Sequence, residues 1–196
     1  MIETLLLASH NKGKLKEFDT LLQGLVGEVK SAADMRLIEP AETGTTFLEN
    51  ATIKALAAMR VTGLPSLSDD SGLSINALNG DPGVYSADWA GYPRDFQKAM
   101  ALVHEKMGDA SDKSAYFTSV LVLAYPDGRI EHFEGRVNGA ICWPPRGVEG
   151  FGYDPMFVPE GYDKSFGELS ADIKKSISHR VMAVEKFITY LKGEKA

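Results

Sequence analysis

A short apolar run that stops at a polar loop constrains the fold of this chain more than any other feature of its sequence. Residues 4–8 (TLLLA) are typical of a strand that is buried on both faces. Residues 9–14 (SHNKGK) are polar, and apolar side chains then recur at helical spacing from Leu15 to Leu25. A strand, a loop and a helix in this order favour an α/β protein.

The rest of the chain continues this mixture of helices and strands. Thr46 followed by Glu49 matches a capping box, so a second helix is expected to begin near Thr46. Residues 126–128 (PDG) join two β-rich segments into a hairpin, which makes the expected sheet mixed rather than purely parallel. The other expected elements are a strand ending in a polar turn at 69–72, a strand at 73–78, helices at 94–107 and 178–192, and the two hairpin strands at 115–125 and 130–141.

Length, charge and cysteine content narrow the class of protein. A chain of 196 residues predicts a single domain over 1–196, and no apolar run approaches the roughly 20 residues that span a bilayer. The N-terminus has no basic region before its apolar stretch, and Cys142 is the only cysteine, so we expect a cytoplasmic protein without disulfides. A formal net charge of −6 argues against a general nucleic-acid binder and, by itself, also against a polyanionic ligand.

Two polar segments could carry phosphate chemistry. The loop at 9–14 precedes a helix, where backbone N–H groups and lysines attract anions, although a helix cap with solvated lysines is the commoner outcome for such a loop. Asp69 and Asp70 are adjacent carboxylates, which suit Mg²⁺ and could take a proton from an attacking water. A solvated turn explains this pair equally well.

Two further segments combine polar or aromatic residues. Glu42 lies in a loop, whereas Asn50 and Lys54 share one helix face, which could simply be solvated. Residues 151–155 (FGYDP) could sandwich a flat base between aromatic rings, although core packing is the commoner use of such rings.

The last candidate segment is basic and lies near the start of the final helix. Ser178 is a natural helix cap, and Lys174, His179 and Arg180 flank it. Positive charges at a helix start oppose its dipole unless an anion or an acidic partner lies there. This placement favours a ligand, although an isolated histidine such as His179 is more often structural.

These segments, in this order, resemble the inosine/xanthosine triphosphate pyrophosphatase family from Leu5 to Leu191. Each matching run is weak alone, but their consistent separations make the set highly specific. The runs are Ser9-x-Asn11-x-x-Lys14, Phe47-x-Glu49-Asn50-Ala51-x-x-Lys54, Asp69-Asp70-Ser71-Gly72-Leu73, Gly80-x-Pro82-Gly83-Val84-Tyr85-Ser86-Ala87, Phe151-Gly152-Tyr153-Asp154-Pro155 and Ser178-His179-Arg180.

The resemblance implies a role for each matching position. The triphosphate would be held by Ser9, His10, Asn11, Lys12, Gly13 and Lys14, with added positive charge from Lys54. Glu42 and Asp70 would hold Mg²⁺, Asp70 would also accept the proton of the attacking water, and Ser71 would contact the substrate. The base would be cradled by Phe151, Gly152, Tyr153 and Asp154, with Phe151 and Tyr153 stacking on it, and Lys174, His179 and Arg180 would complete the pocket.

The same resemblance implies an elongated α/β fold: a mixed β-sheet flanked by helices, with two lobes and a central nucleotide-binding cleft. It also implies a homodimer. One segment departs from the family pattern, because Asp88 stands where an arginine is usual and residues 92–97 are shortened and lack the usual Asp and Asn.

The implied activity is Mg²⁺-dependent hydrolysis of a non-standard purine nucleoside triphosphate to the monophosphate and pyrophosphate, which cleanses the nucleotide pool. Arg180 would donate to the O6 atom of a 6-oxo purine, and Asp154 would accept from a ring N–H. The alternatives are a pyrophosphatase with broader or pyrimidine specificity, and a nucleotide-sensing protein that has lost catalysis. A nucleic-acid-binding module is the weakest of these, given the net charge.

Overall fold

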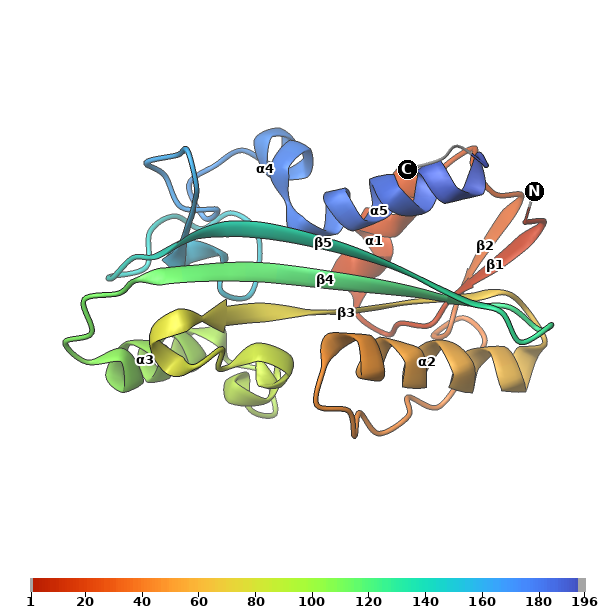
Figure 1. Cartoon of the computed structure of the whole chain (residues 1–196), viewed down its shortest axis with the longest axis horizontal. Coiled ribbons are helices and arrows are strands. Elements are labelled where there is room, and N and C mark those ends of the chain that lie inside the picture. Colours follow the sequence, from red (N-terminus) through yellow and green to blue (C-terminus); the bar gives the residue numbers. More distant parts are fainter. Residues whose placement is uncertain (1, 194–196) are drawn as a thin grey trace. The chain divides into compact units, whose positions relative to one another are not determined.

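The computed structural model is a mixed α/β structure (Figure 1). It describes residues 2–193, apart from the side chains of Lys12, Glu17, Asp19 and Thr20. The strands are β1 (Thr4–Leu7), β2 (Glu28–Ser31), β3 (Ser66–Ile75), β4 (Ser114–Ala124), β5 (Ile130–Ile141) and β6 (Phe157–Pro159). The α-helices are α1 (Lys12–Leu22), α2 (Phe47–Thr62), α3 (Phe96–Met107), α4 (Ala171–Ile177) and α5 (His179–Leu191).

The strands form one sheet in the order β2-β1-β3-β4-β5-β6. Strand β1 pairs in parallel with both β2 and β3, whereas β5 and β6 pair antiparallel. The chain reverses between β4 and β5, where the Tyr125 N–H donates to the Arg129 carbonyl oxygen (2.9 Å). The expected mixed sheet and its hairpin are therefore confirmed.

The chain divides into two compact units, each drawn from separate stretches of sequence. Unit 1 holds the residues up to Asp70, residues 119–134 and the residues from Ala183 onward. Unit 2 holds residues 71–118 and 135–182. The strands β3, β4 and β5 each contribute residues to both units, and each unit has its own hydrophobic core; the single domain over 1–196 stays a prediction.

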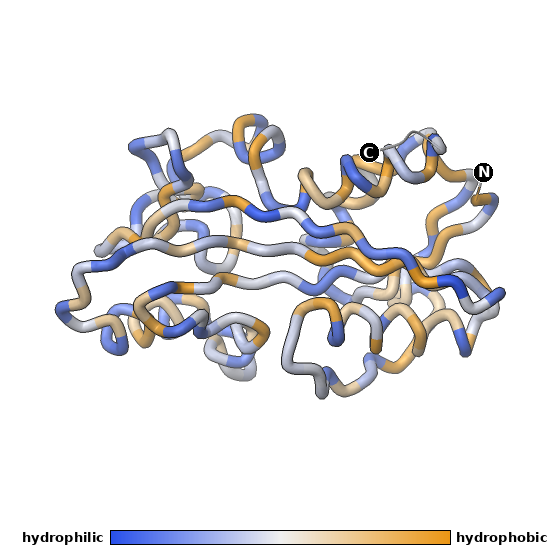
Figure 2. The backbone as a smooth tube through the Cα atoms, viewed as in Figure 1, coloured by the Kyte–Doolittle hydropathy of each residue, from blue (hydrophilic) through white to orange (hydrophobic). Residues whose placement is uncertain are grey.

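Strand alternation builds unit 1 as a layer of sheet between helices. Leu121 and Leu123 of β4 pack with residues of α1 and α5, whereas Val120 and Val122 pack with Ala51 and its neighbours on α2. Successive side chains of a strand point to opposite faces, so a strand covered on both sides must be apolar throughout. The C-terminal half of β4 shows this pattern (Figure 2).

A second core lies within unit 2, where α3 covers part of the sheet. Ala99, Met100, Val103 and Met107 share one face of α3 at helical spacing and are buried in this core. Their partners include Phe117 and several residues of the 143–170 segment. That Gly- and Pro-rich segment is therefore structural, because it supplies Tyr153, Met156, Phe157, Phe166 and Leu169 to this core.

The expected turn at 69–72 is wrong. Asp69 and Asp70 lie in the interior of β3, which runs without a break from Ser66 to Ile75. Two adjacent aspartates in a sequence normally indicate a solvent-exposed segment, but here both are buried beside lysines from two helices. A local pattern cannot show those distant partners.

The expected final helix at 178–192 is confirmed as α5, but a separate short helix, α4, directly precedes it. Ser178 has an extended backbone and separates α4 from α5, so Lys174 lies in the last turn of α4 rather than at a helix start. A lysine at a helix C-terminus interacts favourably with the helix dipole. The Ser178 hydroxyl accepts from the Val181 N–H (3.3 Å), as a cap of α5 should.

The capping box of α2 provides a test of the fold. Thr46 Oγ1 accepts from the Glu49 N–H (3.2 Å), and Glu49 Oε2 accepts from the Thr46 N–H (3.1 Å). Replacing Thr46 by Ala should lower the free energy of unfolding by about 1 kcal/mol, because a cap of the first turn is lost. Equilibrium urea denaturation measures this change.

Thr52 of the same helix is the matched control. Its hydroxyl donates to the Leu48 carbonyl oxygen (2.7 Å), a contact that adds little to a helix. Thr52→Ala should leave the free energy of unfolding within about 0.5 kcal/mol of the wild-type value. Equal losses from the two substitutions would contradict the role of Thr46 as a cap.

Candidate active site

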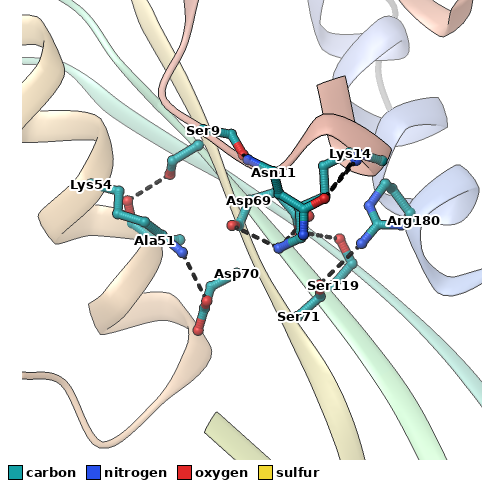
Figure 3. Close-up of polar contacts among 12 residues, drawn as sticks. Ser9, Asn11, Lys14, Ala51, Lys54, Asp69, Asp70, Ser71, Ser119 and Arg180 are labelled. Atoms are coloured by element: carbon teal, nitrogen blue, oxygen red, sulfur yellow. Dashed lines mark hydrogen bonds and ion pairs between the residues drawn. The ribbon is translucent and has the colours of Figure 1, made fainter. Parts of the chain in front are cut away.

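A buried lysine lies between two carboxylates in unit 1. Lys54 Nζ donates to Glu42 Oε1 (2.6 Å) and to Asp70 Oδ1 (2.8 Å). Lys54 is 7% exposed and Asp70 is 6% exposed, whereas Glu42 lies at the protein surface. Figure 3 shows Lys54 reaching from α2 toward Asp70 on β3.

The loop that carries Glu42 is fastened to the start of α2. The buried Asn50 side chain accepts from the Gly44 N–H (2.8 Å), two residues after Glu42. A side chain at Gly44 would approach Asn50 Oδ1 to 2.7 Å, so only glycine fits there. The Glu49 carboxylate accepts from the Thr45 N–H (2.7 Å) as well as from the helix cap. The motif around Glu49 and Asn50 thus places Glu42 beside Lys54.

Burial and charge oppose each other in this cluster. Burial raises the pKa of Asp70, and the positive charge of Lys54 counteracts that rise only in part. Burial alone would lower the pKa of Lys54, but Asp70 and Glu42 together raise it above its usual value. Lys54 is therefore held as a cation, and Asp70 is a more basic carboxylate than one in water.

The cluster fits a divalent cation that is completed by a ligand. Asp70 Oδ2 is buried without a hydrogen-bond partner among the described residues, and Glu42 lies on the other side of Lys54. No three His, Cys, Asp or Glu side chains of the described residues are grouped to hold a metal ion. Two carboxylates with water and phosphate oxygens are a common set for Mg²⁺, whose all-protein cages are rare.

A second lysine meets the neighbouring aspartate. Lys14 Nζ lies 3.0 Å from Asp69 Oδ2 and donates to the Asp69 carbonyl oxygen (3.3 Å). The Ser119 hydroxyl of β4 donates to Asp69 Oδ1 (2.8 Å; Figure 3). Asp69 and Asp70 are consecutive on β3, so their side chains reach α1 and α2 on opposite faces of the sheet.

The loop at 9–14 is partly a helix cap. Asn11 Oδ1 accepts from the Gly13 N–H (3.0 Å) and the Lys14 N–H (3.2 Å), so these donors of the helix start are already used. The Ser9 hydroxyl oxygen accepts from the Asn11 N–H (3.2 Å). His10 Nε2 donates to the Leu37 carbonyl oxygen (2.8 Å), which joins this loop to the segment before Glu42. The expected role of Lys12 falls on a side chain outside the described residues.

Unit 2 contains a separate group of charged and aromatic side chains. Lys174 of α4 forms an ion pair with Asp154, which is 3% exposed. Lys174 Nζ also lies 4.6 Å from the centre of the Phe151 ring. The Phe151 N–H donates to Asp154 Oδ2 (2.7 Å), so this carboxylate holds both the loop and the lysine. Burial raises the pKa of Asp154, with Lys174 as the main opposing charge.

The basic residues at the start of α5 belong to the same unit. Arg180 Nη2 donates to the Ser71 hydroxyl (3.1 Å), although these residues are far apart in sequence. The ring of His179 stacks on Phe117 at 5.0 Å between centroids. Both residues are buried, and the structure brings Ser71, Arg180, Phe151 and Asp154 together in unit 2.

The two aromatic residues of the FGYDP run differ in their surroundings. Phe151 is partly exposed and can offer a ring face to a ligand. Tyr153 is buried in the core, its ring edge-to-face with Phe96 at 5.4 Å, and its hydroxyl donates to the Ser86 carbonyl oxygen (2.8 Å). Packing therefore accounts for Tyr153, and the expected stacking of this ring on a base remains a prediction.

Sequence reasoning missed three residues that organise these groups. Asp69 enters the sequence analysis only as half of a carboxylate pair, without the structural partners it has here, and Ser119 does not stand out inside its β-rich run. A signal for Ser119 does exist, because it shares the strand face of Leu121 and Leu123 and is the polar member of that series. Ser86 fastens its own turn to β3, since its hydroxyl accepts from the Leu73 N–H (2.9 Å). That bond explains part of the Gly80–Ala87 run.

The fold and these clusters define an α/β protein whose buried carboxylates and lysines suit an anionic ligand that arrives with a cation. The Ham1 family model matches residues 5–190, so the chain belongs to the Ham1 family. The predicted family membership and α/β fold class are thereby confirmed.

Named relatives and solved structures agree with this assignment. The chain is 56% identical over 191 residues to the dITP/XTP pyrophosphatase of Ruegeria pomeroyi, covering 95% of this chain and 94% of that protein. It is 52% identical over 201 residues to that of Rhizobium meliloti, covering 94% of each. The Ham1 protein structure from Coxiella burnetii superposes with a TM-score of 0.92 at 38% identity, covering 98% of this chain and 100% of that one.

A membrane-spanning segment was not expected from the sequence. Among the residues that the structure describes, no helix has both the length and the apolar character to cross a bilayer.

The hydroxyl of Tyr153 gives a test of the unit 2 core. Tyr153→Phe removes the donor to the buried Ser86 carbonyl and keeps the ring, so the free energy of unfolding should fall by about 1–3 kcal/mol. The control is Tyr92→Phe, because Tyr92 is fully exposed and should tolerate loss of its hydroxyl. Urea denaturation compares the two, and indistinguishable midpoints would contradict a structural role for the Tyr153 hydroxyl.

Proposed function

We propose that this chain is a metal-dependent nucleoside triphosphate pyrophosphatase that hydrolyses non-standard purine substrates such as dITP, ITP and XTP. The products are the nucleoside monophosphate and pyrophosphate. The observation that carries the proposal is the buried Lys54 between Glu42 and Asp70, with one Asp70 oxygen left open. Support also comes from the curated relatives called dITP/XTP pyrophosphatases, which match over most of the chain.

The unit 1 cluster serves the triphosphate in this proposal. Glu42 and Asp70 would hold Mg²⁺, which would neutralise charge on the phosphate oxygens. Asp70 also accepts a proton from the attacking water. Lys14 and Lys54 stabilise negative charge on the pyrophosphate leaving group. The loop before α1 and the first residues of that helix hold the phosphates, and this segment consists of Ser9, His10, Asn11, Lys12 and Gly13.

The unit 2 group serves the base. Phe151 offers its exposed ring for stacking on the base. Gly152 belongs to the same loop, and Tyr153 and His179 pack on the rings of Phe96 and Phe117 nearby in unit 2. Arg180, which contacts Ser71 through Nη2, carries a guanidinium with several N–H donors, and in this proposal it donates to the O6 atom of a 6-oxo purine. The ion pair of Asp154 and Lys174 fixes this part of the base pocket, and Asp154 accepts from a ring N–H of the purine. Adenine would place an amino donor against Arg180 and lose that bond.

A pyrophosphate-release assay on a nucleotide panel tests the proposal. The panel contains dITP, XTP, the four common deoxynucleoside triphosphates and a modified pyrimidine triphosphate, each with and without Mg²⁺. We expect the highest kcat/KM on dITP and XTP, dependence on the metal, and pyrophosphate rather than stepwise orthophosphate. A preference for pyrimidines would support a pyrophosphatase with broader or pyrimidine specificity. Binding without turnover would support a nucleotide-sensing protein that has lost catalysis.

Asp70 provides the sharpest test of mechanism. Asp70→Asn keeps the shape of the side chain but removes the base and a charge on the metal, so kcat should fall by at least about 100-fold. Asp109→Asn is the control, because Asp109 is exposed and outside both clusters. Near-normal turnover of the Asp70 variant, with a folded protein by circular dichroism, would remove Asp70 from the proton-accepting role.

Arg180 tests the reading of the base. Arg180→Ala should raise the KM for dITP by about tenfold, because the O6 atom loses its donor. The ratio of kcat/KM for dITP over dATP should fall with it. Arg60→Ala, on the exposed side of α2, should change neither quantity. An unchanged dITP/dATP ratio in the Arg180 variant would show that another group selects the base.

Two wider expectations remain predictions. The family resemblance predicts a homodimer, which sedimentation of the purified chain would test. The single cysteine and the charge balance predict a cytoplasmic protein that binds nucleotides rather than long nucleic acids.

A further inference from the structure

Ser119 is a fully buried serine whose hydroxyl points at a carboxylate. It lies in β4 with 0% of its surface exposed, and it donates to Asp69 Oδ1 over 2.8 Å. Its strand neighbours on the same face, Leu121 and Leu123, belong to the apolar core. A polar side chain on this apolar strand face needs a hydrogen-bond partner. For Ser119 that partner is a charged carboxylate rather than a backbone carbonyl.

Asp69 connects this serine to Lys14. The opposite oxygen of the Asp69 carboxylate lies 3.0 Å from Lys14 Nζ, and the Asp69 carbonyl oxygen accepts from the same ammonium over 3.3 Å. The Asp69 side chain is 1% exposed, so little water surrounds this ion pair. Ser119, Asp69 and Lys14 thus form one line of polar contacts from β4 through β3 to α1 (Figure 3).

We propose that Ser119 is a positioning residue that fixes Lys14 for the triphosphate by holding the Asp69 carboxylate. This inference rests on the proposed function of Lys14 at the phosphates. Lys14 has a long, flexible side chain, and a fixed acceptor removes freedom that substrate binding would otherwise have to remove. The Ser119 bond sets the plane of that acceptor, so its effect reaches the substrate only through Asp69 and Lys14.

A double-mutant cycle distinguishes this role from a general effect on packing. The four proteins are wild type, Ser119→Ala, Lys14→Met and the double variant, assayed on dITP. Ser119→Ala alone should lower kcat/KM by about tenfold, in the range that coupled polar neighbours show. In the Lys14→Met background the same substitution should change kcat/KM by less than about twofold, because its route to the substrate is gone.

Ser66 supplies the matched control. It is also a serine of unit 1 with 0% exposure, but its hydroxyl donates to the Leu64 backbone carbonyl (3.0 Å). Ser66→Ala should leave kcat/KM within about twofold of the wild-type value. Ser119→Cys, which has a weaker donor in nearly the same volume, should fall between wild type and Ser119→Ala. An effect equal to that of Ser66→Ala, or equal factors in both backgrounds, would overturn the proposal.

Binding of inorganic tripolyphosphate separates this inference from the proposed function. Calorimetry on the same four proteins needs no hydrolysis and no base. Weaker binding by Ser119→Ala that disappears in the Lys14→Met background would support the positioning role even if dITP were not hydrolysed. Hydrolysis of dITP by the wild type, with additive effects of the two substitutions on tripolyphosphate binding, would support the function and overturn the role of Ser119.

Discussion

Two neighbouring carboxylates buried in one strand set the requirement that the rest of unit 1 meets. Asp69 and Asp70 are consecutive in β3, so they point to opposite faces of the sheet. A buried carboxylate is stable as an anion only beside a positive charge or several donors. Helix α1 brings Lys14 to one face and helix α2 brings Lys54 to the other. The two helices that close the core therefore also neutralise the strand between them.

Local patterns were sufficient where the interaction itself is local. The capping box at Thr46, the hairpin turn and the first strand, loop and helix could all be predicted, because each depends on residues a few positions apart. The turn at 69–72 was predicted wrongly for the opposite reason. Its aspartates are stabilised by lysines that lie 16 and 55 positions away. No pattern around Asp69 and Asp70 contains that information.

In the candidate site, too, local features could be predicted from the sequence and long-range contacts could not. Motifs in the sequence identified which residues belong to the candidate site. The contacts that each residue makes could not be predicted, because they depend on partners that are distant in sequence. Asn11 caps a helix, Tyr153 packs in a core and Asp154 fastens both a loop and Lys174. Ser119 carries no motif at all and is identified only by the carboxylate that it touches.

The net charge of −6 looked unsuited to a polyanion, and the structure explains why the total misleads. Binding depends on charges within a Debye length, about 8 Å at physiological ionic strength, and on their burial rather than on their sum. In unit 1 the carboxylates of Asp69, Asp70 and Glu42 each lie beside Lys14 or Lys54. Such a cluster is locally close to neutral, and a divalent cation makes it positive. The acidic total therefore argues against a long nucleic acid more than it argues against the metal-bound triphosphate proposed above.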